Sequence, residues 1–307
     1  MTDSTNDILQ KTDALKGFLA NFEKELGNVD LRAKVLALVP VFYKLREVGK
    51  SILPGQFAAS ARDRILFYFR KYPMLVISGD EFLVVSGIQE YARRIRELRV
   101  EHGWQIISGV TANEMFKEGE LPLEQKVIES MGTDDYMLLS VVQDREAAYR
   151  WHVANEIRGS ADGVREKILC FFRRNIGKQI TGEELRYVAK DKTEWARRVR
   201  ELRTEFGWPI VSKQTGRPEL PIGVYLLESA RQSPEHDRKI PDDVRGAVLR
   251  RDGYKCTECD WSHKEWNSSD PRHLELHHIK EHVKGGENTA ENLKTLCNVC
   301  HDKMHRK

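Results

Sequence analysis

Long apolar runs, tracts of like charge and low-complexity segments are all missing from this sequence. No stretch of its 307 residues approaches the roughly 18 apolar residues that a membrane-spanning helix needs. The first residues also lack the apolar run of a secretory signal. We therefore expect a cytoplasmic protein with no membrane partner. A chain of this length predicts several small domains rather than one large core.

Charge of one sign is not in large excess. The 50 lysines and arginines nearly balance the 47 aspartates and glutamates, which leaves a formal net charge of +3. This excess is mild for a protein that binds a polyanion such as DNA. If the chain binds nucleic acid, its positive charge must be concentrated on particular faces.

Cysteine is scarce, and four of the five cysteines stand in two CxxC pairs near the end of the sequence. The pairs are Cys256 with Cys259 and Cys297 with Cys300. Each CxxC turn presents two thiolates, and two such turns complete the tetrahedral shell of a structural zinc site. Disulfides are disfavoured because nothing in the sequence suggests secretion. We therefore predict a structural Zn²⁺ ion that supplies much of the folding energy of residues 241–307.

The fifth cysteine has a different setting. Cys170 lies in the apolar run Ile168-Leu169-Cys170-Phe171-Phe172. Free cysteine usually behaves as a small buried hydrophobe. We therefore predict that Cys170 is buried in a core and takes no part in metal binding.

The segment between the two CxxC pairs has the pattern of a ββα unit. Residues 272–279 alternate well enough for a strand, and residues 284–288 have the composition of a loop. Residues 293–296 can form a short returning strand. A helix over about 298–306 then begins at the second CxxC pair and carries His301.

Residues 240–307 resemble the HNH endonuclease family, whose ββα-metal fold cuts phosphodiester bonds. Order, spacing and residue types all agree with that family. The matching residues are Arg250-Arg251-Asp252-Gly253-Tyr254, His277-His278-Ile279, Gly285-Gly286, Asn292-Leu293, and Leu296-Cys297 to His301.

The resemblance implies a role for each matching polar residue. His278, the second residue of the pair, is the general base, while His277 and His301 hold the catalytic metal. Asn292 holds the base or the loop in place. Many family members have Asp at the position of His277, so the choice among Mg²⁺, Mn²⁺ and softer ions stays open.

Three further histidines are left outside this set. His305 lies one turn after His301 and could replace or join it as a metal ligand. His273 and His282 are expected at the surface.

These residue types suit phosphodiester hydrolysis. An imidazole can take a proton from an attacking water near neutral pH. A metal ion on His277 and His301 would stabilise the departing oxygen as a Lewis acid, giving 5′-phosphate and 3′-hydroxyl ends. The alternatives are a plain zinc ribbon, in which the histidines are surface residues or zinc ligands, and a degenerate module that does not cut. A ribbon, however, has no need of adjacent histidines on a strand.

Residues 64–108 and 167–212 are two copies of one pattern. In each, an apolar helix precedes a short helix and a longer Arg-rich helix, and Gly-Trp then leads into a strand pair. The expected strands are 104–108 with 136–141 and 210–213 with 223–228. Two copies are too few for a solenoid, so the pattern indicates a duplicated module.

Local signals fix the helices of each copy. Ser78 with Glu81 and Thr181 with Glu184 form capping boxes that begin the second helix. Apolar residues recur at helical spacing in the third helix and predict a buried stripe. The stripes are Tyr91, Ile95 and Leu98 in copy one and Trp195, Val199 and Leu202 in copy two.

Three helices followed by a β-hairpin is the plan of the winged helix-turn-helix family, and both repeats resemble it. That resemblance implies a third helix in the major groove and a wing on the DNA backbone. The candidate DNA-binding residues are Gln89, Glu90 and Arg93 in copy one, and Lys192, Thr193, Glu194, Arg197 and the wing residue Arg217 in copy two. The other third-helix arginines are expected to meet phosphates or neighbouring carboxylates. Arginine spaced at three and four residues beside glutamate is also typical of a solvated helix face.

Residues 1–60 predict two helices with more apolar surface than a lone helix pair can hide. Pro40 is expected to kink or split the second helix. We prefer a homodimer contact as the use of this surface, because cutting both DNA strands usually takes two sites related by a twofold axis. Packing onto the first winged helix is the alternative.

The expected fold class is α+β and multidomain. The expected parts are a helical N-terminal region (1–60), two winged helix-turn-helix domains (61–145 and 160–230), a polar linker (231–240) and a zinc-stabilised ββα-metal domain (241–307).

The combination predicts a site-specific endonuclease of double-stranded DNA that looks like a prokaryotic restriction enzyme. Unmodified and modified targets are both open, with a slight preference for modified cytosine because duplicated readers suit a doubly modified site. Reading 5-methylcytosine would need an apolar contact with the C5-methyl group. The alternatives are a DNA-binding regulator with a non-catalytic zinc module, and a nuclease directed by RNA or by nucleic-acid structure.

Overall fold

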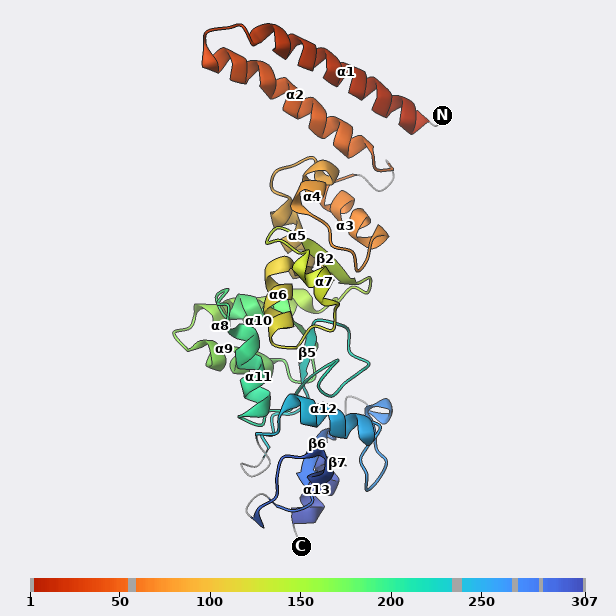
Figure 1. Ribbon diagram of the computed structural model, residues 1–307, viewed down its shortest axis with the longest axis vertical. Coiled ribbons are helices and arrows are strands. Elements are labelled where there is room, and N and C mark those ends of the chain that lie inside the picture. Colours follow the sequence, from red (N-terminus) through yellow and green to blue (C-terminus); the bar gives the residue numbers. More distant parts are fainter. Residues whose placement is uncertain (1–2, 55–58, 234–238, 267–269, 282–283, 306–307) are drawn as a thin grey trace. The chain divides into compact units, whose positions relative to one another are not determined.

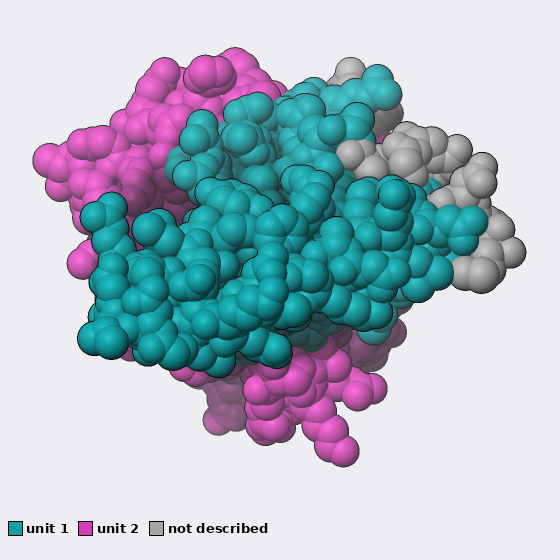
Figure 2. Space-filling view, turned by 90° about the horizontal axis from the view of Figure 1, so that it is seen from above, with its two compact units in different colours: residues 1–106, 131–147 teal, residues 107–130, 148–307 magenta. Residues whose placement is uncertain are grey.

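The computed structural model describes residues 3–54, 59–233, 239–266, 270–281 and 284–305, in two compact units (Figures 1 and 2). Unit 1 comprises residues 1–106 and 131–147, and unit 2 comprises residues 107–130 and 148–307. None of the helices described has the length and apolar character needed to cross a membrane.

Unit 1 begins with a helical hairpin of α1 (Asp3–Glu25) and α2 (Leu31–Ser51). The carboxylate of Asp30 caps α2 by accepting from the backbone N–H of Arg32 at 3.0 Å. Of the two outcomes expected at Pro40, the split does not occur, because α2 runs through Pro40 as one element. Helix α2 packs against α1, and this packing helps to keep it helical despite the backbone hydrogen bond that proline cannot make.

The apolar surface of α2 is only partly covered within the chain. Its C-terminal end packs on α4 (Gly79–Ser86), so closely that a Cβ on Gly49 would lie 2.6 Å from the carbonyl oxygen of Val84. Further along the helix, Leu36, Phe42 and Tyr43 are exposed. The structure thus shows packing onto the first repeat at one end of α2, and the homodimer contact stays a prediction.

The first repeat forms the rest of unit 1. It contains α3 (Ala61–Lys71), α4, α5 (Tyr91–Val100) and the paired strands β1 (Gln105–Ser108) and β2 (Tyr136–Ser140). The capping box of Ser78 and Glu81 is formed, as predicted. Ile95 and Leu98 of α5 are buried against Phe69 and Phe82, so the predicted apolar stripe is core.

The second repeat lies in unit 2 and has the same order of elements. After α8 (Ala147–Gly159) come α9 (Val164–Arg174), β3 (Ile180–Thr181), α10 (Gly182–Val188), α11 (Trp195–Thr204), β4 (Ile210–Ser212) and β5 (Val224–Leu227). The three strands form an antiparallel sheet in the order β3-β5-β4. The predicted capping box of Thr181 and Glu184 is formed. Three helices and a pair of strands are therefore present in both repeats, as the predicted duplication requires, and β3 is an additional short strand of the second.

Cys170 corrects the sequence analysis. It was predicted to be buried, but its side chain is exposed. The helix α9 buries Ile168, Phe171 and Phe172, and this spacing puts Cys170 on the opposite, solvent-facing side.

A connection from the first repeat is built into unit 2. It carries α6 (Gly109–Lys117) and α7 (Gln125–Glu129), and α6 packs on α10. A Cβ on Gly182 would meet the sulfur of Met115 at 2.5 Å, which explains glycine at the start of α10. The indole N–H of buried Trp195 donates to the carboxylate of Glu114 at 2.6 Å. The long connection therefore covers one side of α11.

A buried arginine joins three segments of unit 2. The side chain of Arg203, near the end of α11, is 2% exposed and lies 2.5 Å from Glu120, which is 1% exposed. Its Nε also donates to Asp242, the first residue of α12, at 2.8 Å. Burial opposes the charge of Arg203, but the two carboxylates outweigh this effect and raise its pKa.

Replacing Arg203 with alanine is expected to lower the free energy of unfolding of unit 2 by about 3–5 kcal/mol, because buried carboxylates would lose their partner. Arg200→Ala is the matched control: Arg200 lies on the same helix, 41% exposed, and pairs with Glu118 at 2.9 Å. Its loss should cost at most about 1 kcal/mol. Urea unfolding followed by tryptophan fluorescence measures both, and equal losses would contradict the buried role of Arg203.

The C-terminal part of unit 2 is the predicted ββα arrangement. It consists of α12 (Asp242–Arg251), η3 (His263–Glu265), β6 (Leu274–His278), η5 (Ala290–Asn292), β7 (Leu293–Cys297) and α13 (Asn298–His305). Strands β6 and β7 pair antiparallel, with His277 opposite Lys294 and His278 opposite Leu293. Apolar residues of α12 and both strands form the core, among them Val248, Leu276 and Leu296.

Candidate active site and metal centre

The four cysteines of the CxxC pairs come together. Their sulfur atoms all lie within 4.8 Å of one another, and the Sγ atoms of Cys259 and Cys297 are 3.8 Å apart. Four sulfurs placed about 2.3 Å from one tetrahedral zinc ion would be about 3.8 Å apart. Among the residues that the structure describes, this is the one group of three or more such side chains able to hold a metal. The cluster therefore fits a zinc ion.

The electrostatics of the cluster also favour a cation. Burial and the neighbouring thiols raise the pKa of Cys297 and of Cys300. Burial also opposes ionisation of Cys256, but backbone N–H groups of the CxxC turns outweigh it and lower the pKa of that thiol. Thiols crowded in this way can ionise together only if a cation compensates their charge.

Beside this cluster, strand β6 and helix α13 bring three histidines together. His277 and His278 are adjacent at the end of β6, and His301 lies one turn into α13. The rings of His277 and His301 are 5.1 Å apart between centroids. All three side chains are buried, and His301 is only 1% exposed. The structure thus brings together the two residues expected to hold a catalytic metal.

Glu275, which the sequence analysis did not single out, contacts the ring of His301. Its Oε2 lies 2.9 Å from the Nδ1 of His301, and its Oε1 lies 2.9 Å from the Nε2 of His273. A carboxylate on one ring nitrogen fixes the orientation of a metal-ligating histidine, so a metal would bind His301 through Nε2. The alternation of β6 places Glu275 and His277 on the same face, which was the available sequence signal.

The surface position expected for His273 is wrong. His273 is 1% exposed; its backbone is hydrogen-bonded to Asn298 at the start of α13 and its ring contacts Glu275. Burial would raise the pKa of Glu275, but the hydrogen bond from His273 and the close contact with the ring of His301 outweigh it and hold that pKa well below its ordinary value. Burial conversely lowers the pKa of His273, and its bond to Glu275 raises it overall. His282 and the side chain of His305 lie outside the described residues.

The ring of His278 is held by the loop after β6. Its Nε2 lies 2.7 Å from the Oδ1 of Asn288. Asn288 comes from the loop that was predicted over residues 284–288, and the sequence analysis gave it no role. An asparagine just after the Gly285-Gly286 pair was the only signal that could have drawn attention to it.

The side chain of Asn292 holds this same loop. Among the described residues, its hydrogen bonds go to the backbone of the loop and not to the ring of His278. Its Oδ1 accepts from the N–H of Lys280 at 2.9 Å, and its Nδ2 donates to the carbonyl oxygens of Lys280 and Glu287. The two ends of the loop are thereby tied together. Of the two uses expected for Asn292, the geometry supports the loop-holding one.

Arg251 and Asp252, which precede the first CxxC pair, stabilise the strand pair. Arg251 donates to the carbonyl oxygens of Ala290 and Leu293 at 2.6 and 2.7 Å. The carboxylate of Asp252 accepts from the N–H of Thr295 at 2.8 Å. These contacts hold β7 against α12. The Arg-Asp pair at the end of α12 therefore contributes to the structure of the site.

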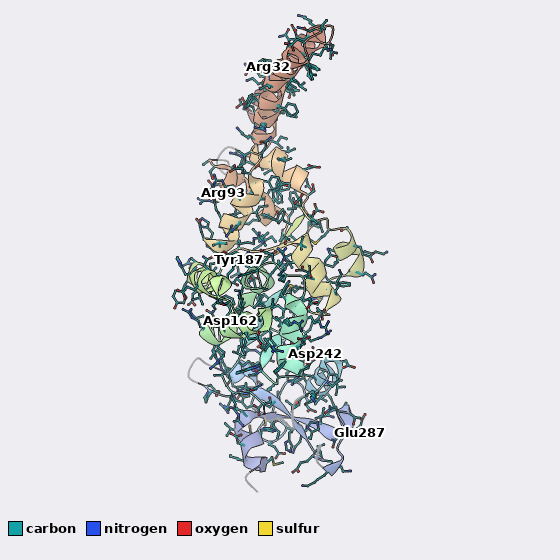
Figure 3. The ribbon with its side chains drawn as sticks, turned by 90° about the vertical axis from the view of Figure 1, so that its left-hand side faces the viewer. Arg32, Arg93, Asp162, Tyr187, Asp242 and Glu287 are labelled. Atoms are coloured by element: carbon teal, nitrogen blue, oxygen red, sulfur yellow. The ribbon has the colours of Figure 1, made fainter. Side chains whose placement is uncertain are left out.

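The predicted DNA-binding residues at the start of each third helix are exposed. Gln89 and Glu90 lie in the turn before α5, and Arg93 in its first turn is 68% exposed (Figure 3). In the second repeat Lys192, Thr193 and Glu194 precede α11 and line a hollow with Arg165 and Arg198. Arg197 is exposed and pairs with Glu201 at 3.0 Å. These residues are accessible to a partner, and their contact with DNA stays a prediction.

Arg217 is in a different situation. Its side chain is only 12% exposed and pairs with Glu219 and, at 3.3 Å, with Glu228. A phosphate contact would have to replace these carboxylates. Arginines of the third helices also pair with carboxylates, as Arg94 does with Glu97 and Arg198 with Glu201. This agrees with the solvated-face alternative for those positions.

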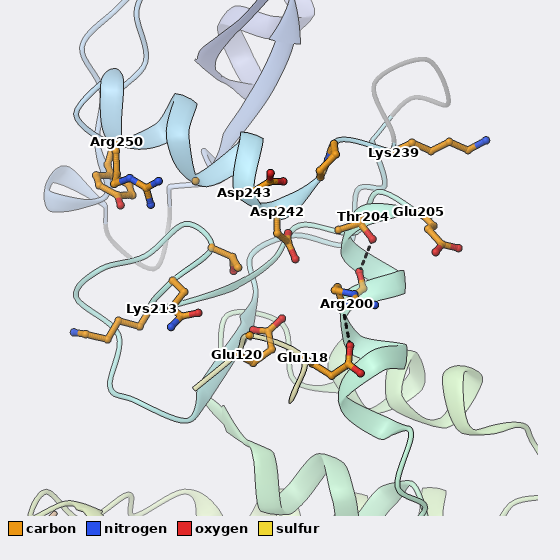
Figure 4. Close-up of a pocket in the computed structure, with 16 residues that line it drawn as sticks. Glu118, Glu120, Arg200, Thr204, Glu205, Lys213, Lys239, Asp242, Asp243 and Arg250 are labelled. Atoms are coloured by element: carbon orange, nitrogen blue, oxygen red, sulfur yellow. Dashed lines mark hydrogen bonds and ion pairs between the residues drawn. The ribbon is translucent and has the colours of Figure 1, made fainter. Parts of the chain in front are cut away.

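A cleft of about 1060 Å³ lies in unit 2, lined by the end of α11, residues 213–215 and the start of α12 (Figure 4). Arg200, Lys213, Lys239 and Arg250 contribute positive charge, but it is offset by the five acidic residues Glu118, Glu120, Glu205, Asp242 and Asp243. The mixed lining gives no preference for an anionic ligand.

Comparison with known proteins assigns these parts. The model of the HNH endonuclease family matches residues 256–307, which contain both cysteine pairs and all three histidines. The model of the KpnI N-terminal domain matches residues 62–124 and 165–228, which contain the two repeats. No curated protein and no solved structure matches the chain. Residues 256–307 therefore belong to the HNH endonuclease family, and the repeats before them belong to a restriction-enzyme family, that of the KpnI N-terminal domain.

Proposed function

We propose that this protein is a site-specific endonuclease of double-stranded DNA, of the restriction type. The observation that carries this proposal is the set of buried histidines in the HNH segment. His277 and His278 end β6, and the ring of His301 on α13 faces His277 at 5.1 Å between centroids. A zinc ribbon that only stabilises the fold would leave this second cluster without a use.

In the proposed reaction, His278 is the general base. A water molecule attacks phosphorus and gives its proton to the imidazole, while the bond to the 3′ oxygen breaks and that oxygen takes a proton from solvent. The products carry 5′-phosphate and 3′-hydroxyl ends. Asn292 keeps the loop after β6 closed, and Glu275 orients the ring of His301. An ion such as Mg²⁺ or Mn²⁺ held by His277 and His301 would supply Lewis-acid stabilisation of charge on the phosphate.

For the two repeats we propose the winged helix-turn-helix role. The order of helices and strands in the second repeat, with β4 and β5 as an antiparallel pair after α11, supports it. The start of α11 would then enter the major groove, with Lys192, Thr193 and Arg197 nearest the bases. Arg93 has the corresponding position on α5.

Two further parts of the proposal concern assembly and setting. Two copies of the chain would place one nuclease centre at each strand, and the exposed apolar residues of α2 are the surface that we assign to this homodimer. We also propose that the protein acts in the cytoplasm of a prokaryote, a setting that the match to a restriction-enzyme family supports.

Cleavage of plasmid DNA tests the proposal. Purified protein with Mg²⁺ or Mn²⁺ is expected to give discrete fragments, and we favour cytosine-methylated plasmid over unmodified plasmid as the substrate. Ligation of the fragments without prior phosphorylation would confirm 5′-phosphate ends. Tight binding of duplex DNA with no cutting of either plasmid would instead favour a DNA-binding regulator.

A further inference from the structure

The proposed general base is connected by hydrogen bonds to the second repeat. The Nε2 of His278 lies 2.7 Å from the Oδ1 of Asn288. The Nδ2 of Asn288 donates to the backbone carbonyl of Lys239 at 3.2 Å. The backbone N–H of Lys239 in turn donates to the carbonyl of Thr204, the last residue of α11, at 2.7 Å. The backbone of one residue, Lys239, thus lies between the end of α11 and the residue that holds His278.

The chemistry of these groups sets the direction of each bond. A backbone carbonyl can only accept, so the amide nitrogen of Asn288 must face Lys239. The amide oxygen of Asn288 therefore faces the imidazole, and Nε2 of His278 must carry the proton. This tautomer leaves Nδ1 as the basic nitrogen that can accept a proton from water.

The backbone of Lys239 is held in place by contacts of residues before and after it in the chain. Ser233, before it, donates from its N–H to the carbonyl of Gly207 at 2.8 Å. Asp242, after it, is the residue paired with buried Arg203 of α11. Residues 231–240 were expected to be a linker, and residues 234–238 of it lie outside the described part. The described residues on either side of that gap are bound to the second repeat.

The backbone of Lys239 is also in an uncommon conformation. Its φ of 69° lies in the left-handed region, which is unfavourable for a residue with a side chain. The bonds to Thr204 and Asn288 hold it there. Backbone strain of this kind is often found where a segment serves a function.

We propose that Asn288 is a positioning residue for His278, and that it couples the general base to α11 through the backbone of Lys239. This inference rests on the proposed nuclease function. The base has the required tautomer and orientation while residues 239–242 are docked on α11. The helix proposed to read DNA and the group proposed to cut it are therefore parts of one connected unit.

Three variants test this assignment. Asn288→Ala removes both bonds of the side chain. Asn288→Asp keeps an oxygen for the Nε2–H of His278 but loses the donor to Lys239. Glu287→Ala, an exposed neighbour in the same loop (Figure 3), is the matched control. Each is measured by single-turnover cleavage at saturating protein, by DNA affinity with Ca²⁺ in place of Mg²⁺, by zinc content, and by amide hydrogen exchange of residues 239–242.

Asn288→Ala is expected to lower the cleavage rate about 10- to 100-fold, the usual loss when the residue that orients an active imidazole is removed. Its DNA affinity and zinc content should stay within about twofold of the wild type. Asn288→Asp should recover most of the rate. Both Asn288 variants should exchange faster at residues 239–242, whereas Glu287→Ala should resemble the wild type throughout.

An unchanged rate in Asn288→Ala, or equal losses in the alanine and aspartate variants, would overturn the positioning role. Unchanged exchange at residues 239–242 would overturn the connection to α11. The exchange measurement needs no cleavage, so failure of the coupling is distinguishable from failure of the proposed function. In the latter case the wild type itself would cut no DNA.

Discussion

Replacing His278 with alanine is expected to lower the rate of DNA cleavage by about 10²- to 10⁴-fold, the usual contribution of a general base. The attacking water would lose its proton acceptor, while the proposed metal ligands His277 and His301 would remain. DNA affinity should not change, because His278 is 2% exposed and lies at the end of a strand rather than on the proposed reading helices. Single-turnover cleavage of a plasmid, followed on gels, measures the effect.

His152→Ala is the control for that experiment, since His152 is an exposed histidine of α8 in the same unit. It should cut at the wild-type rate. Because His278 is buried, zinc content and far-ultraviolet circular dichroism must show that the His278→Ala protein is folded. A folded His278→Ala protein that still cuts at full rate would refute the role of His278 as the base.

Removing the metal from the cysteine cluster is expected to unfold the nuclease segment. Structural zinc contributes about 10–16 kcal/mol of apparent binding energy in small zinc modules, more than such a segment can lose and remain folded. Cys297→Ser, or a strong chelator, should release one zinc ion per chain. Residues 241–307 should then lose their protection from proteolysis, whereas the first repeat in unit 1 should keep its own.

The fluorescence of Trp261 can be used to follow this transition. It is 1% exposed, and its carbonyl accepts from the N–H of Cys256 at 2.9 Å, so loss of the metal should expose it to water. Cys170→Ser is the matched control, because Cys170 is exposed and lies outside the cluster. It should retain zinc and the native fluorescence. Retention of zinc and of protease resistance by the Cys297→Ser protein would contradict a structural role for the cluster.

The sequence predicted those features that depend on short-range spacing. CxxC turns place two thiols together whatever surrounds them, and both pairs do meet. Capping boxes depend on residues three apart, and those beginning at Ser78 and Thr181 are formed. Adjacent histidines on an alternating strand were sufficient to indicate the pair at the end of β6.

Prediction failed where a residue's surroundings come from distant segments. The apolar neighbours of Cys170 suggested a core position, but the orientation of α9 on its sheet exposes it. His273 was expected at the surface, and the packing of α13 over β6 buries it. A kink or a split was expected at Pro40, and the split did not occur, since a local rule for proline does not include the packing of α2 against α1.

The sequence by itself therefore determined the zinc ligands, the histidine pair and the duplication, since each is written in residues close together along the chain. Only the tertiary structure decided what holds them in place. Glu275 of β6 contacts His301 of α13, and Asn288 of the loop after β6 contacts His278. The backbone of Lys239 contacts the end of α11, so each contact joins separate segments of the chain. A hydrogen bond depends on the positions of its two partners in space. For partners as far apart in the chain as Thr204 and Lys239, those positions exist only after the segments have packed together.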